Sequence, residues 1–397
     1  MKTISTEKDT LSDDNTYINQ MTKLTKTIKD NWVSTAGSNI SVFENKVSNY
    51  TKSKYCIACN SGTSALHIAL KVLGVNKKHE VIAPSITFIA TINAIKYNDA
   101  APIFMDVDDS FNIDEDKTIH FLEKNTEIKN GDCVNKKTKK IIKALIVAHI
   151  WGNGAKIRKL ISVCRKKNIK ILEDAAESLG TYYKKKYLNN KHTGTIGGIG
   201  ILSFNGNKII TTGAGGMILT NNKTLAKKSR YLINQAKDND FFKHNEIGYN
   251  YKMPNLNAAL GLSQIKKLNK IKKLKKRVYE DYLSIFKNSK IFSVLKCDKI
   301  SNNNNWMVIL QLRKNINKKF LDYLIKSQIK KIQFRKIWPP NETQLIYKKY
   351  ERYKVTNSHK LFNYSICSPC SANLTYNKIE YIQKSIKKSY ENFINFK

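Results

Sequence analysis

The chain has 397 residues, of which 41% are hydrophobic, an ordinary fraction for a globular protein long enough to form two domains. No apolar run approaches the roughly 18–20 residues of a membrane span, and the polar first residues do not resemble a signal peptide. This composition excludes an integral membrane protein. It predicts a cytoplasmic protein with no membrane partner.

The chain carries 70 Lys and Arg against 31 Asp and Glu, a formal net charge of +39. Such a charge is typical of nucleic-acid binding, but it also follows from the Lys-rich and Asn-rich composition that AT-rich codon usage produces. A nucleic-acid surface needs clustered cations, and the basic residues here are spread along the whole chain. We therefore predict no nucleic-acid partner, although the positive field attracts anionic substrates.

Seven cysteines include the two C-x-x-C pairs Cys56/Cys59 and Cys367/Cys370. Together these pairs have the composition of a four-cysteine zinc site. Cys56 and Cys59 lie in an apparent strand, however, where positions three apart face opposite sides. The odd number of cysteines also favours reduced thiols. We therefore predict no metal site.

The first half of the chain alternates short apolar runs with amphipathic segments, which predicts an α/β fold. The strand at 55–59 is followed by the turn NSGTS and a helix over 64–72. Further along, the pattern predicts strands at 80–88, 101–107, 144–152, 169–178, 200–204 and 215–220, with helices at 89–97 and 155–167.

The pattern changes near residue 256, where apolar residues begin to recur every three to four positions. Residues 256–286 predict a long helix, and the polar run 301–305 predicts a loop tip. Strands are expected near 306–312 and 331–334, and a last helix over 377–393. We predict a large domain over 1–260, which includes an N-terminal helical segment, and a small α+β domain over 261–397.

Three features together indicate pyridoxal chemistry. Asp174 ends a buried strand, where a carboxylate needs a cationic partner such as a pyridinium nitrogen. Lys208 lies in a tight turn between two apolar strands, and a buried lysine has a lowered pKa and reacts with aldehydes. The strand–turn–helix junction at 60–66 offers N–H groups and hydroxyls that hold a phosphate. Each feature alone is more often structural, but their order and spacing favour a pyridoxal enzyme.

With these motifs the chain resembles the DegT/StrS family of sugar aminotransferases. The resemblance implies a fold-type I, aspartate aminotransferase-like fold and pyridoxal 5′-phosphate as cofactor. Within the family it resembles most the branch that acts at C4 of UDP-linked 4-keto-6-deoxy sugars, as in bacillosamine and legionaminic acid pathways. The features that suggest this branch are FIATINAIKY, FMDVDDSFNID, AESLGTYY and SFNGNKIITTG. The segments that match the wider family are WVSTAGSNISVFE (32–44), SGTSALHIAL (61–70), PSITFIATINAI (84–95), LEDAAESLG (172–180), SFNGNKIITTGAGGM (203–217), NEIGYNYKMPNLNAALG (245–261) and CSPCSANLT (367–375).

The resemblance implies that two residues carry the chemistry. Lys208 would bind the cofactor covalently and later move a proton on the substrate carbon. Asp174 would keep the pyridine nitrogen protonated, which makes the ring an electron sink. Glu177 would lie near the pyridine hydroxyl, and Phe88 would stack on the ring.

The remaining implied roles concern anion binding. Gly62, Thr63 and Ser203 would hold the cofactor phosphate. Asn250 would reach the same phosphate from the partner subunit, which implies a homodimer with shared active sites. Arg335 is a candidate for binding an anionic part of the substrate.

These roles imply a two-stage reaction. An amino acid, L-glutamate by expectation, would give its amino group to the cofactor, and a nucleotide-linked keto-sugar would then receive it. A first alternative is a pyridoxamine-dependent sugar dehydratase on the same scaffold, but those relatives lack the lysine that Lys208 provides. A second alternative is a non-catalytic, basic nucleic-acid-binding protein.

Overall fold

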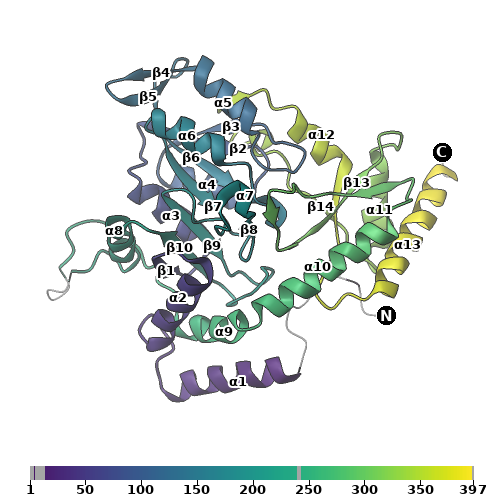
Figure 1. Ribbon diagram of the computed structural model, residues 1–397, viewed down its shortest axis with the longest axis horizontal. Helices are drawn as coiled ribbons and strands as arrows, with labels where there is room; N and C mark the ends of the chain where they lie inside the picture. Colours follow the sequence, from purple (N-terminus) through teal and green to yellow (C-terminus); the bar gives the residue numbers. More distant parts are fainter. Residues whose placement is uncertain (1–3, 5–13, 239–242, 396–397) are drawn as a thin grey trace.

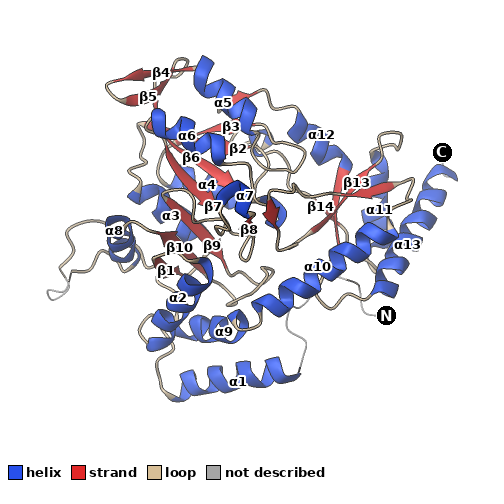
Figure 2. Ribbon diagram, in the orientation of Figure 1, coloured by secondary structure: helices blue, strands red, loops and turns tan. Residues whose placement is uncertain are grey.

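A ten-stranded sheet forms the centre of the protein in the computed structural model, which describes residues 4, 14–238 and 243–395 (Figures 1 and 2). Six neighbouring strands, from β9 to β15, run parallel, and β10 joins them antiparallel with β1 at the edge. Along the sheet the strands are β1 (Tyr55–Cys59), β10 (Gly216–Thr220), β9 (Ile199–Ser203), β7 (Lys170–Asp174), β6 (Ile141–Ala148), β2 (His79–Pro84), β3 (Ala101–Met105) and β15 (Arg352–Tyr353), with β4 (Thr126–Lys129) and β5 (Asp132–Asn135) beside β6.

Helices cover both faces of this sheet, because its strands bury side chains on both sides. One face packs against α3 (Gly62–Val72), α4 (Ile89–Tyr97) and α8 (Lys223–Ile233). The other packs against α2 (Ser38–Thr51) and α9 (Asn255–Ile265) at one end, and α5 (Glu115–Lys124) and α6 (Arg158–Lys166) at the other. Helix α1 (Asp14–Lys29) lies along α9 (Figure 1).

The C-terminal part forms a smaller sheet with its own helices. Helix α10 (Leu268–Ile285) runs from the large sheet to this part, as Figure 1 shows. The smaller sheet has the order β11 (Phe292–Val294), β13 (Val308–Leu312), β16 (Ser365–Ser368) and β14 (Arg335–Lys336). The helices α11 (Lys319–Gln328) and α13 (Tyr376–Asn395) pack on each other, and α12 (Asn357–Tyr364) precedes β16. The predicted division at 260 and 261 falls inside α9 and stays a prediction.

Three predicted strands end early at the same edge of the sheet. β2 ends at Pro84, β6 at Ala148 and β7 at Asp174, whereas the apolar pattern continues to residues 88, 152 and 178. Most residues directly after each strand remain buried as the chain turns, although Phe88 is exposed, and Ile150–Gly152 forms a 3-10 turn, η1. An apolar sequence pattern indicates burial, and these turns are largely buried like the strands before them. The pattern therefore does not reveal where the hydrogen-bonded pairing between strands stops. The predictions at 55–59 and 89–97 are confirmed by β1 and α4.

Three predictions for the C-terminal half are wrong. The helix over 256–286 is divided into α9 and α10, because residues 266 and 267 separate them. The strand expected at 331–334 begins directly after that range, as β14 (Arg335–Lys336). Ile332 itself makes an isolated bridge with Ile4. The expected loop tip at 301–305 is instead an anchored segment: Ser301–Asn302 forms β12, which pairs with β8 (Tyr182–Tyr183), and Asn304 is fully buried.

Asp106 joins the large sheet to the C-terminal part. Its carboxylate is fully buried directly after β3, and it forms an ion pair with Lys117. It accepts hydrogen bonds from the backbone N–H groups of Thr356 (3.0 Å), Asn357 (2.9 Å) and Ser358 (2.8 Å), at the start of α12. Burial alone would raise the pKa of Asp106, but the bonds from Lys117, Ser358, Asn357 and Thr356 outweigh it and lower that pKa.

We expect Asp106→Asn to lower the free energy of unfolding by roughly 3 kcal/mol, because the amide loses the charge that its buried donors face. The folded-state pKa lies below the unfolded value of about 3.9, so the stabilisation is complete above that value and disappears as the pH falls further. Urea unfolding at pH 7 and pH 3 measures both effects. Asp116→Asn, whose side chain is 83% exposed, is the control and should cost about 0.5 kcal/mol or less. An equal difference between wild type and Asp106→Asn at both pH values contradicts this account.

Candidate active site

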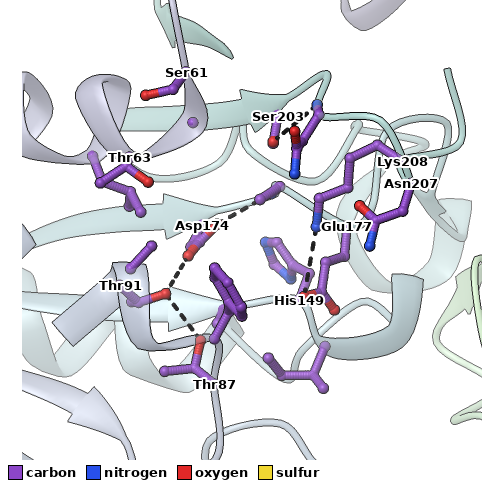
Figure 3. A pocket seen from close by; sticks show the side chains of 18 of the residues that line it. Ser61, Thr63, Thr87, Thr91, His149, Asp174, Glu177, Ser203, Asn207 and Lys208 are labelled. Carbon is purple, nitrogen blue, oxygen red and sulfur yellow. Dashed lines mark hydrogen bonds and ion pairs between the residues drawn. The ribbon is translucent and has the colours of Figure 1, made fainter. Parts of the chain in front are cut away.

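A pocket of about 380 Å³ opens at the carboxyl ends of β2, β6, β7 and β9. The carboxyl ends of parallel strands are where ligands bind in open α/β sheets, because the polypeptide turns away there and leaves a crevice. The pocket brings together eight of the nine predicted site residues: Gly62, Thr63, Phe88, Asp174, Glu177, Ser203, Lys208 and Arg335. Figure 3 shows Thr63, Asp174, Glu177, Ser203 and Lys208 around it.

Lys208 lies in the turn that follows β9, where its backbone N–H donates to the carbonyl of Asn205 (3.0 Å). Its side chain is only 13% exposed, and Nζ lies 4.0 Å from Oε1 of Glu177. The same Nζ lies 4.3 Å from the centre of the Trp306 ring. Burial lowers the pKa of Lys208, while the charges of Glu177 and Asp174 oppose that shift. The amine is therefore more easily deprotonated than an exposed lysine.

Glu177 lies beside this amine in the turn after β7. Its Oε2 accepts a hydrogen bond from the backbone N–H of Trp151 (2.8 Å). Burial raises the pKa of Glu177 to about 7, against the lowering effects of Lys208 and of the Trp151 N–H. Trp151 has a φ of 58°, a left-handed conformation that is costly for a bulky residue and concentrates at functional sites.

Asp174 is the last residue of β7 and is 6% exposed. Its Oδ2 accepts from the Thr91 hydroxyl (2.7 Å) and its Oδ1 from the Ala176 N–H (3.1 Å). The hydroxyls of Thr87 and Thr91 lie 3.0 Å apart, which extends the network to the loop after β2 (Figure 3). These contacts hold the carboxylate in the pocket wall.

The N-terminus of α3 forms the opposite end of the pocket. Ser61 caps the helix, and its Oγ accepts from the N–H of Ser64 (3.0 Å). The first N–H groups of a helix have no intrahelical carbonyl, so they are available to an anion. A Cβ on Gly62 would lie 2.9 Å from the Ser203 Cβ, so only glycine allows α3 to approach Ser203 this closely. Ser203 and Thr63 add hydroxyls to this end.

Three aromatic side chains line the pocket: Phe88, Trp306 and Trp338. Phe88 is 51% exposed and meets the edge of Trp338 at 5.8 Å. Trp338 stacks on Trp151 at 4.4 Å, and Trp151 is also parallel to Trp306 at 6.4 Å. Arg335 joins this wall from β14 of the smaller sheet.

Asn250 does not line this pocket. It lies on the surface, and its carbonyl accepts a hydrogen bond from Nδ2 of Asn60 (3.3 Å). The neighbouring Tyr249 and Tyr251 stack on each other at 5.1 Å, and both rings contact His67. Asn250 is therefore exposed between two residues that anchor the segment to α3.

The sequence interpretation missed Trp306 and Asn304. The indole N–H of Trp306 donates to the Asn207 carbonyl (2.8 Å), which fixes the turn beside Lys208. Nδ2 of Asn304 donates to the carbonyls of Glu177 (2.8 Å) and Leu179 (3.0 Å), and its Oδ1 accepts from the Trp306 N–H (2.9 Å). The only signal in the sequence is a tryptophan directly after a polar run, which is too common to indicate a site.

His149 was missed as well. It lies at the end of β6 and is 1% exposed, and its Nε2 lies 3.0 Å from Oε2 of Glu173. Glu173 also accepts from the N–H groups of Gly194, Ile196 and Gly197. Successive strand residues face opposite sides, so Asp174 faces the pocket while Glu173 fastens the loop behind it.

The donor set fits pyridoxal 5′-phosphate. An aldehyde needs an amine of lowered pKa, which Lys208 offers, and a pyridinium nitrogen needs a carboxylate, which Asp174 offers. The glycine cradle between α3 and Ser203 fits a phosphate. Within the ranges that the structure describes, no group of three or more His, Cys, Asp or Glu side chains forms a metal site. No helix among those residues is both long and apolar enough to cross a membrane.

Comparison with known proteins identifies the family to which the chain is similar. A profile of the DegT/DnrJ/EryC1/StrS aminotransferase family matches residues 15–387. The chain is 32% identical over 362 residues to GDP-perosamine synthase of Escherichia coli O157:H7, covering 90% of this chain and 92% of that protein. It is 32% identical over 279 residues to UDP-4-amino-4,6-dideoxy-N-acetyl-β-L-altrosamine transaminase of Campylobacter jejuni, covering 69% and 68% of the two chains.

Solved structures share the fold. Helicobacter pylori PseC, an aminotransferase involved in pseudoaminic acid biosynthesis, has a TM-score of 0.85 at 22% identity, covering 98% of this chain and 100% of that one. A DegT DnrJ EryC1 StrS aminotransferase from Brucella abortus also has a TM-score of 0.85, at 23% identity, covering 94% and 96%. The α/β fold-type I prediction is thereby confirmed.

Asn304 yields a prediction about how the site is held together. Asn304→Ala removes two donors and one acceptor from a buried position, and we expect it to lower the free energy of unfolding by roughly 2–3 kcal/mol. The isosteric Asn304→Asp should cost at least as much, because it turns an oxygen toward the carbonyls of Glu177 and Leu179. Urea unfolding followed by tryptophan fluorescence measures both. The exposed Asn302→Ala is the control, and a loss as large as that of Asn304→Ala would refute the specific role.

Proposed function

This chain belongs to the DegT/DnrJ/EryC1/StrS aminotransferase family and is a pyridoxal-phosphate-dependent sugar aminotransferase, and on that premise we propose its substrates and residue roles. The proposed reaction moves an amino group from L-glutamate to C4 of a nucleotide-linked 4-keto-6-deoxy sugar. The observation that carries it is the convergence of Lys208, Asp174 and the N-terminus of α3 on one pocket.

When bound, the cofactor supplies an electron-withdrawing ring that stabilises the negative charge left on carbon after a proton leaves. Asp174 holds a proton on the ring nitrogen, and Thr91 fixes the orientation of its carboxylate. Lys208 would hold the cofactor covalently, and its free amine would then carry a proton to and from the substrate carbon. Its lowered pKa keeps the amine available as a base.

Two parts of the pocket are suited to binding the anionic groups of the cofactor and the substrate. Gly62, Thr63 and Ser203 hold the cofactor phosphate at the N-terminus of α3, where the helix dipole favours negative charge. Phe88, which lines the pocket, would stack on the cofactor ring and exclude water from it. Arg335 binds an anionic group of the incoming substrate, since a guanidinium matches carboxylates and phosphates.

The names of two relatives support the substrate class. The Campylobacter jejuni transaminase is named for a UDP-linked 4-amino-4,6-dideoxy sugar, and the Escherichia coli protein for GDP-perosamine. The names of these two relatives contain different nucleotides. We propose UDP for this chain because its segments FIATINAIKY, FMDVDDSFNID, AESLGTYY and SFNGNKIITTG resemble the branch that acts on UDP-linked sugars. Neither alternative function is favoured, because Lys208 is present and buried as the aminotransferase chemistry requires.

The substrate proposal predicts a specific product. Purified protein with pyridoxal 5′-phosphate, L-glutamate and a panel of UDP-linked, GDP-linked and TDP-linked 3-keto and 4-keto sugars should aminate a UDP-linked 4-keto-6-deoxy sugar fastest. Mass spectrometry and NMR identify the product, and 2-oxoglutarate should accumulate in equal amount. Lys208→Ala is the control and should form no product. Amino exchange only between amino acids and 2-oxo acids would show that the sugar assignment is wrong.

We also propose that the protein is a homodimer in which Asn250 binds the cofactor phosphate of the partner subunit. Asn250 is exposed and absent from its own pocket, whereas its two tyrosine neighbours fix its segment on α3. A two-fold interface is isologous, so each subunit would give one Asn250 and receive one.

A mixing experiment tests this arrangement. Lys208→Ala and Asn250→Asp are prepared separately, shown to be inactive, and refolded together. If Asn250 acts across the interface, each heterodimer has one intact site, so roughly a quarter of all sites should recover on random pairing. If Asn250 acts within its own chain, each site keeps one defect. Heterodimers that form but show no activity, or an active monomer, would exclude the shared site.

A further inference from the structure

Two buried ionisable groups face each other in the pocket. Glu177 and Lys208 lie 4.0 Å apart, with side chains 7% and 13% exposed. We propose that Glu177 is the proton acceptor and donor of Lys208, so that the pair shares one proton and presents a neutral amine beside a carboxylic acid. This role goes beyond a contact with the cofactor, and it rests on the proposed covalent role of Lys208.

The burial of both groups favours the transfer. An ammonium and a carboxylate in a dry pocket each lose hydration, and their mutual attraction repays that loss only at close contact with good geometry. At 4.0 Å the pair has no direct hydrogen bond, so the charged form is poorly compensated. Burial lowers the pKa of Lys208 and raises that of Glu177, and both directions favour the neutral pair.

The surrounding backbone holds the carboxyl group in place. The Trp151 N–H donates to Oε2 of Glu177, which leaves Oε1 directed at Lys208. Trp151 provides that N–H from a left-handed conformation, and Asn304 fixes the backbone carbonyl of Glu177. Lys208 is long and flexible, so closing the remaining distance to the roughly 2.6–3.2 Å needed for proton transfer is a rotamer change.

Proton transfer within the pair precedes bond formation to the aldehyde. The Lys208 ammonium gives one proton to the Glu177 carboxylate, which leaves an amine and a carboxylic acid. The amine nitrogen forms a bond to the carbonyl carbon of an incoming aldehyde, and the carbonyl oxygen leaves as water. Glu177 supplies one proton to that oxygen and the nitrogen supplies the second, so that water leaves. The remaining N–H proton returns to the Glu177 carboxylate as the carbon–nitrogen double bond forms, which restores the carboxylic acid. The carboxylate of Asp174 is already engaged, because Thr91 and Ala176 donate hydrogen bonds to it.

Three other titratable or charged groups lie near the pair: His149, Arg335 and Cys367. His149, from the end of β6, contacts Glu173, and Arg335 approaches from β14. Cys367 of β16 interacts electrostatically with Glu177 and Arg335, and burial raises the pKa of its thiol, so it stays protonated near neutral pH. The pH response near neutrality is therefore assigned to Glu177 and Lys208.

The experiment measures how fast the cofactor-free protein captures pyridoxal 5′-phosphate between pH 5 and pH 10, which requires no turnover. Stopped-flow absorbance gives the rate, and borohydride reduction with peptide mapping identifies the lysine. In wild type the one-proton form of the pair reacts, so the rate should be bell-shaped in pH. Its acid limb reports the loss of the amine and its alkaline limb the loss of the acid.

Glu177→Gln keeps an acceptor for the Trp151 N–H but cannot exchange a proton. We expect its maximal capture rate to fall on the order of 100-fold and its alkaline limb to disappear. Glu177→Asp should keep the bell shape at a lower rate. Glu44→Gln is a matched control: Glu44 is also 7% exposed and accepts a 2.8 Å bond from a backbone N–H, that of Ala58, but it pairs with Arg230 away from the pocket. Its profile should match wild type.

Two failures are distinguishable. If Lys208 is labelled but Glu177→Gln keeps the wild-type rate and both limbs, the alkaline limb belongs to the aldehyde and the proton-sharing pair is overturned, while the proposed function stands. If wild type is labelled at another lysine, or not at all, the assignment of Lys208 itself fails. Unchanged near-ultraviolet circular dichroism in Glu177→Gln verifies that the fold is intact.

Discussion

The site depends on burying a lysine amine at the carboxyl edge of a parallel sheet. An ammonium is costly to bury, so the protein lowers its pKa and surrounds it with groups that tolerate either protonation state. Glu177 offers a carboxyl that is itself easily protonated, and the face of Trp306 offers attraction without charge. The strands β2, β6 and β7 end early at this edge, and the turns that follow them leave the crevice that the amine occupies.

The two carboxylates of this edge differ because their surroundings differ. Asp174 receives a hydroxyl and a backbone N–H, contacts that stabilise a negative charge, whereas Glu177 shares its burial with an amine. Asn304 connects this edge with the C-terminal part, since it binds the backbone of Glu177 and positions Trp306. The smaller sheet therefore supplies a wall of the site, and its folding and the shape of the pocket are coupled.

Local patterns predict the elements of the large sheet well, because a buried parallel strand is a short apolar run with a turn after it, as at Tyr55–Cys59. They also place Lys208, Asp174 and Gly62 in one pocket, since these residues follow strands whose carboxyl ends meet. They fail where burial comes from a distant partner. The polarity of the 301–305 run predicts exposure, yet Asn304 is buried because carbonyls more than 100 residues away accept its bonds. Trp306 and Trp338 line the pocket because of tertiary packing alone, and no residue spacing in the sequence predicts this position.

The net charge of +39 acts on a different scale from the site. At physiological ionic strength charges are screened over roughly 8 Å, so lysines spread over the surface raise the local concentration of anions but leave pKa values inside a closed pocket unchanged. Burial lowers the pKa of Lys208, and the charges that oppose this shift belong to Glu177 and Asp174 of the pocket rather than to surface lysines. A nucleotide-linked sugar is an anion of the kind such a surface attracts. Under the proposed role of Arg335, which lines the pocket, selection between anions would then fall to its guanidinium, because a planar guanidinium distinguishes ligands by geometry as well as by charge.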